Sequence, residues 1–185
     1  MRVVNDKATR ALSALLGSAG VRAPRARADA GWPAGFGQRG TVVPEWLPGF
    51  GERLRCALDG RTGLVLNVQE GCGTCRCEPS ALAAALTEMV RRVRDAMPID
   101  GTLLVSAGAC AGPQRDALIP ASGTAGHWVA IGVGSDSARS LDLNWNVAPP
   151  RTDLARFARR WEAALTLQRI EREGMHLVLH LPRNR

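Results

Sequence analysis

The sequence contains no apolar run of the roughly 18 residues that a membrane-spanning helix needs. Its first apolar stretch, residues 11–21, is interrupted by serine and glycine and is followed by arginines, which is not typical of a cleaved signal peptide. Five cysteines are an odd number and do not suit a disulfide framework. We therefore expect free thiols, no membrane span, and a protein that is cytoplasmic or exported without a cleaved signal peptide.

The charge is unevenly spread along the chain. The formal net charge is +7, and most of it lies in the first 40 residues. Six of the seven basic residues there lie within residues 2–27, which contain no aromatic side chain, so this pattern disfavours nucleic acid as a partner.

Length and composition indicate one globular domain. The chain has 185 residues, of which 45% are hydrophobic and 22% charged, enough to build a packed core. Residues 1–50 are rich in Ala, Gly, Arg and Pro, and we interpret them as a basic leader and an irregular wrapping segment. Residues 51–185 are expected to form a single domain of the catalytic type.

Hydrophobic periodicity predicts the main elements of that domain. An amphipathic helix is indicated by apolar residues at helical spacing before Pro98, and a second helix follows Asp153. Period-two or short apolar runs predict strands, two of which are expected to pair as a hairpin. The order of elements favours an α+β domain. The expected strands are residues 64–68, 103–105, 127–133, 140–145 and 176–181, with the third and fourth forming the hairpin.

Three cysteines, Cys72, Cys75 and Cys77, gather just before the first of these helices. A helix N-terminus lowers the pKa of a nearby thiol and so favours the nucleophilic thiolate. Such a thiolate needs an imidazole, which His127 can supply. It also needs a polar group to orient that ring, and Asp142 and Asn144 lie on one face of the expected hairpin. The pattern points to thiol chemistry.

These segments resemble the papain-like cysteine hydrolases. Residues 69–75, Gln-Glu-Gly-Cys-Gly-Thr-Cys, are similar to that family's Gln-x-x-Cys-Gly-Ser-Cys segment, and residues 126–134 are similar to its His-Ala-Val strand. Residues 143–145, Leu-Asn-Trp, are similar to its Asn-Ser-Trp. The resemblance extends to compact bacterial papain-fold effectors and toxins. It implies a papain-like α+β fold, with a cysteine at the N-terminus of a helix packed on an antiparallel sheet.

The resemblance implies a role for each matching residue. Cys75 is the expected nucleophile, His127 the general acid and base, Asn144 the orienting group and Gln69 the oxyanion donor. If the chain is more similar to the compact bacterial effectors, the resemblance implies Asp142 in place of Asn144 as the orienting group. Pro79 favours a later helix start, which keeps Cys77 as a second candidate nucleophile.

The expected activity is hydrolysis of an amide bond in a protein or peptide substrate, by a peptidase or a deamidase. Thiolate attack and thioester hydrolysis need no cofactor.

Other uses of the same cysteines stay open at this point. Cys72 and Cys75 form the Cys-x-x-Cys pattern of a thioredoxin-like thiol–disulfide oxidoreductase. Cys72, Cys75, Cys77 and Cys110 can instead supply four thiolates to Zn²⁺ or a [2Fe–2S] cluster. A further alternative moves the nucleophile of hydrolysis to Cys110, upstream of His127.

Overall fold

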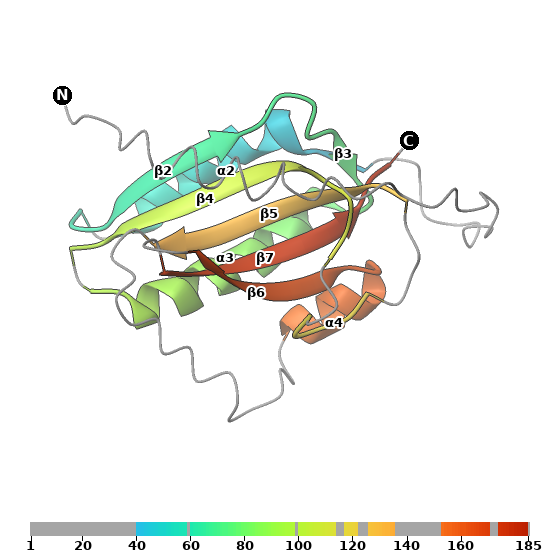
Figure 1. Ribbon diagram of the computed structural model, residues 1–185. Helices are drawn as coiled ribbons and strands as arrows, with labels where there is room; N and C mark the ends of the chain where they lie inside the picture. The colour runs from blue at the N-terminus through green and yellow to red at the C-terminus, as the bar shows by residue number, and fades with distance from the viewer. Residues whose placement is uncertain are drawn as a thin grey trace.

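The protein is a two-layer α/β sandwich in which one face of a mixed sheet is covered by helices (Figure 1). The structure is a computed structural model that describes residues 40–58, 60–98, 100–113, 117–121, 126–135, 153–170 and 174–184. Its elements, in chain order, are β1 (Thr41–Val42), α2 (Val43–Ala57), β2 (Gly63–Val68), β3 (Thr74–Cys75), α3 (Pro79–Ala96), β4 (Thr102–Cys110), β5 (Trp128–Ser135), α4 (Asp153–Arg160), β6 (Ala164–Ile170) and β7 (Gly174–Pro182).

In the part of the chain that is described, the main sheet has five strands in the order β2-β4-β5-β7-β6. β2 and β4 run parallel, and the other neighbouring strands run antiparallel. A separate two-stranded sheet pairs β1 with β3. The sheet is therefore mixed, and the antiparallel sheet of the papain-like expectation is wrong.

The two faces of the sheet differ in composition. Successive residues of a strand point to opposite faces. The core that the helices share takes one set of alternate residues from β4, β5 and β7: Leu103, Val105, Val129, Ile131, Val133, Leu177, Leu179 and Leu181. The other face carries most of the buried polar residues, together with some apolar ones: Ser106, Thr166, His176 and His180 with Leu104, Trp128, Ala130 and Val178.

Helix α3 confirms the clearest sequence prediction. Its five large apolar residues are all buried in the core: Leu82, Leu86, Met89, Val90 and Val93. Pro79 begins the helix, where a missing N–H costs nothing, and the helix ends before Pro98. Cys75 therefore lies in β3 and not at the helix N-terminus, so its expected placement is wrong, whereas Cys77 directly precedes the N-cap residue Glu78, as the later helix start predicts.

The expected hairpin is also wrong. Both edges of β5 are occupied, by β4 on one side and β7 on the other, so no edge remains for a hairpin partner. Residues 140–145 themselves lie outside the described residues. The strands at 64–68 and 176–181 are confirmed within β2 and β7, and the strand at 103–105 extends to Cys110 as β4.

The packed structure includes residues 41–50, which the sequence analysis assigned to the leader segment. Val43, Leu47 and Phe50 of α2 are buried in the core. No helix among the described residues has the length and apolar character needed to cross a membrane.

Candidate functional site

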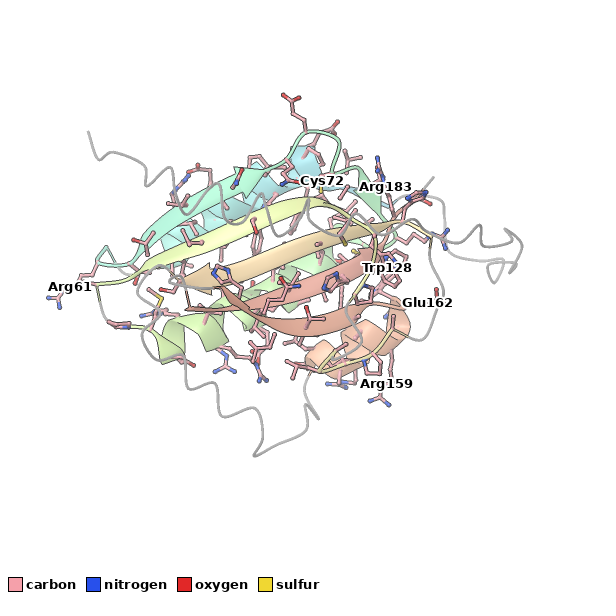
Figure 2. All side chains as sticks on the ribbon, viewed as in Figure 1. Arg61, Cys72, Trp128, Arg159, Glu162 and Arg183 are labelled. Atoms are coloured by element: carbon pink, nitrogen blue, oxygen red, sulfur yellow. The ribbon has the colours of Figure 1, made fainter. Side chains whose placement is uncertain are left out.

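Three of the five cysteines, Cys72, Cys75 and Cys77, lie where β1, β3 and the end of β7 meet. Cys75 pairs with Thr41 of β1 on one side and forms a β-bridge to Arg183 on the other. Cys72, Cys75 and Cys77 are buried, with relative exposures of 0%, 0% and 1%. Figure 2 shows Cys72 and Arg183 at the same end of the molecule. This meeting point, residues 72–77 with Thr41 and Arg183, is called the cysteine junction below.

Within the junction the Cys75 and Cys77 sulfurs are 3.3 Å apart, and the Cys75 thiol lies 3.6 Å from the Thr41 carbonyl oxygen, to which it donates. The hydrogen bond from Cys77 lowers the pKa of Cys75, while the same contact and burial raise the pKa of Cys77. Burial, aided by Cys75, raises the pKa of Cys72 to about 12. Of the three thiols, Cys75 is thus the one whose pKa is lowered.

The residues expected to assist catalysis are placed differently. His127 is solvent-exposed at the start of β5, and its carbonyl oxygen accepts a hydrogen bond from the Arg183 N–H at 3.0 Å. Gln69 follows β2, and its backbone N–H donates to the Ala107 carbonyl at 2.9 Å. Asp142 and Asn144 lie outside the described residues. The side-chain neighbour of the Cys75 thiol that the structure records is therefore another thiol, Cys77, rather than an imidazole.

A second polar cluster lies on the other face of the sheet, and it joins Cys110, a candidate from the sequence, to Thr166 and His180, which were not candidates. The His180 Nδ1 is 3.6 Å from the Cys110 sulfur, and its Nε2 is 3.0 Å from the Thr166 hydroxyl. Burial lowers the pKa of His180 to about 4 and raises the pKa of Cys110. Both groups are neutral near pH 7, so the cluster is a hydrogen-bonded chain and not an ion pair. The alternation of histidine with leucine in residues 176–181 is the sequence signal that places His180 on this face.

The exposed surface of α3 carries a group of charged side chains. The Glu88 carboxylate accepts hydrogen bonds from Arg91 at 2.9 Å and from Arg92 at 2.6 Å, and these lower its pKa. Arg91 also reaches Asp95 at 3.2 Å. Both acidic residues of α3 are thus already bound by arginine. This donor set does not fit a divalent cation, and the described residues include no group of three or more His, Cys, Asp or Glu placed to hold a metal ion.

No protein-family model and no curated protein matches the chain. Solved structures do match its fold. The ATP-binding domain of PrrB from Mycobacterium tuberculosis superposes with a TM-score of 0.54 at 16% identity, over 78% of this chain and 96% of that one. The catalytic domain of the histidine kinase ThkA gives 0.54 at 9% identity, over 78% and 96%. The mycobacterial sensor histidine kinase MprB gives 0.52 at 12% identity, over 80% and 99%.

These likenesses correct the sequence-based predictions of fold and function. The papain-like fold and the cysteine hydrolase of amide bonds are wrong, because the neighbours are histidine kinase domains. Neither the thioredoxin-like oxidoreductase nor the zinc or iron–sulfur alternative is supported. The chain has the fold of the ATP-binding domains of histidine kinases.

Proposed function

We propose that this domain binds an adenine nucleotide. The observation that supports the proposal is the fold likeness, which extends over 96% of a domain described as the ATP-binding domain of a histidine kinase. Function does not follow from fold alone, so the proposal concerns binding and not phosphoryl transfer. Transfer commonly uses a divalent cation held beside the phosphates, and the carboxylates of α3 are engaged by arginines instead.

We place the phosphates of the nucleotide on the arginine-bearing surface of α3. Guanidinium groups bind phosphate oxygens in a bidentate geometry, and Arg91 and Arg92 stand side by side there around Glu88. The C-terminal end of α3 and the end of β5 lie on the same side of the molecule (Figure 1). Glu88 is the group that opposes an anion at this position, because its carboxylate carries the same sign of charge.

Isothermal titration of the purified protein with ADP, with and without Mg²⁺, tests the proposal. We expect saturable binding in both conditions, and Glu88→Gln should tighten it about threefold because a like charge is removed. Glu52→Gln is the control, since it removes the same charge from a pair with Arg55 on α2, although Glu52 is more exposed than Glu88, and it should leave the affinity unchanged. Absence of ADP binding at millimolar concentration would overturn the proposal. If Glu88→Gln binds ADP more weakly than wild type only when Mg²⁺ is present, Glu88 would instead be assigned to a metal ion.

We also propose a cytoplasmic location, which is the first of the two expected locations, and another protein domain as partner in place of the expected protein or peptide substrate. A further neighbour, superposing with a TM-score of 0.50 at 11% identity, is described as the cytoplasmic segment of the histidine kinase QseC.

A further inference from the structure

Among the described cysteines, Cys75 and Cys77 are the pair whose sulfurs are recorded in contact, at 3.3 Å. Cys75 is the last residue of β3, and the chain bends at Arg76 and Cys77 before α3 begins, which brings the two sulfurs together. Cys56 is exposed on α2, and Cys110 contacts His180 instead. Among the described residues, a sulfur–sulfur contact is therefore recorded for Cys75 and Cys77.

The spacing of the pair suits a disulfide. The chain bends at Arg76 and Cys77, so the two Cα atoms lie closer than the roughly 7 Å that two fully extended residues span, and disulfides join Cα atoms up to about 6.8 Å apart. An S–S bond is about 2.05 Å long, so the sulfurs need to approach by little more than 1 Å from their 3.3 Å separation. Rotation of the two side chains supplies a movement of that size.

The backbone on either side of the pair is held from several directions. The Thr41 hydroxyl donates to the Cys77 carbonyl at 2.7 Å. The Arg76 N–H donates to the Pro182 carbonyl at 3.0 Å, and the Asn184 N–H donates to the Thr74 carbonyl at 2.7 Å. These bonds keep the two sulfurs facing each other, which lowers the entropy lost when they are joined.

We propose that Cys75 and Cys77 form a reversible disulfide that senses a small hydroperoxide. The Cys75 thiolate attacks one peroxide oxygen, the O–O bond breaks, and hydroxide leaves, which gives a sulfenic acid on Cys75. The Cys77 sulfur then attacks the Cys75 sulfur, the S–O bond breaks, and the sulfenic oxygen leaves as water with the Cys77 proton. Hydroxide takes up the proton that Cys75 released. In total two thiols are oxidised and one hydrogen peroxide is reduced to two waters.

The hydrogen bond from Cys77 lowers the pKa of Cys75, which makes Cys75 the attacking sulfur. Both sulfurs are buried, so the oxidant reaches them when the β1–β3 pairing opens. That pairing consists of two residues from each strand, and short peripheral pairings open at low cost.

Oxidation has a structural consequence at β1. The Cys75 thiol donates to the Thr41 carbonyl, and a disulfide sulfur has no proton to donate. The disulfide therefore removes one of the bonds between the junction and β1, the strand that leads directly into α2. This inference rests on the junction alone and does not depend on nucleotide binding.

The test is peptide mapping of the full chain after treatment with hydrogen peroxide, with remaining thiols then blocked by iodoacetamide. Trypsin cuts after Arg76, between the two cysteines, so residues 62–76 and 77–91 stay together only through a disulfide. We expect this linked pair of peptides, its disappearance on addition of dithiothreitol, and faster hydrogen exchange at residues 41–43 of the oxidised protein.

Variants identify the sulfurs involved. Residues 62–76 also contain Cys72, so Cys72→Ala is the matched control and should keep the linked peptides, whereas Cys77→Ser should lose them. A Cys56→Ser background removes the exposed thiol and with it intermolecular disulfides. The proposal is overturned if wild-type Cys75 and Cys77 are both recovered alkylated while Cys56 or Cys110 is oxidised. A link that disappears in Cys72→Ala would overturn it as well.

Discussion

At the scale of a single residue, the buried side chain of His180 makes the stability of the protein depend on pH. It is 3% exposed and its pKa is lowered by burial to about 4, against an ordinary value of 6.5. Between these values the unfolded chain binds a proton that the folded chain does not, so stability rises with pH. We expect full stability above about pH 6.5 and a progressive loss as the pH falls towards 4, by roughly 1.4 kcal/mol per unit at most.

Urea denaturation of wild type and His180→Gln between pH 4 and 7 checks this expectation. The variant should lose part of the pH slope, because glutamine does not titrate. His127→Gln is the control at an exposed position and should keep the wild-type slope. Equal slopes for wild type and His180→Gln would contradict the role given to His180.

Gly134 is constrained by a direct contact with a side chain of the neighbouring strand. A Cβ on Gly134 would overlap the His176 imidazole, which is 1% exposed and cannot move into solvent. Overpacking of this kind costs about 1–3 kcal/mol, so Gly134→Ala should lower the free energy of unfolding by that amount in urea denaturation. Gly49→Ala is the matched control, since its Cβ meets nothing within 4 Å in exposed helix, and it should raise stability by about 0.5–1 kcal/mol.

At the scale of elements, the end of α4 depends on an unusual backbone conformation. Glu162, labelled in Figure 2, has a φ of 52°, in the left-handed region that favours glycine. It allows the Ala163 N–H to donate to the Ala158 carbonyl at 2.9 Å and so closes the helix. Glu162→Gly should raise the thermal midpoint, with a gain of about 0.5–1 kcal/mol. Glu52→Gly, inside α2, should lower the free energy of unfolding by about 1 kcal/mol. A loss of stability in both variants would contradict the assignment.

Elements with local signals could be predicted from the sequence. α3 has an apolar stripe, a proline in its first turn and a proline beyond its end, and the structure confirms each of these. The end of α4 could not be predicted in this way. The stripe of Leu154, Phe157, Trp161 and Leu165 indicates one continuous helix, but the helix ends at Arg160, and Leu165 lies in β6 beside β7. Long-range strand pairing overrides helical periodicity there.

At the scale of the whole molecule, the prediction of a papain-like fold was wrong because it rested on a short local motif. Residues 69–75 match a short catalytic segment, but the surroundings of Cys75 are set by Thr41 and Arg183, far away along the chain. The order of strands is likewise a long-range property: β5 lies between β4 and β7 although the sequence suggests a hairpin. At identities of 9–16%, the fold likeness lies in this topology rather than in shared residues.

The central claim is that a domain of this fold binds an adenine nucleotide along α3. Hydrogen exchange of the full chain, measured by mass spectrometry with and without saturating ADP, tests it most directly because it reports both binding and place. We predict slower exchange in the C-terminal half of α3 and at residues 134–135, where β5 ends, with no change in α2. Identical exchange throughout, or protection confined to α2, would contradict the account.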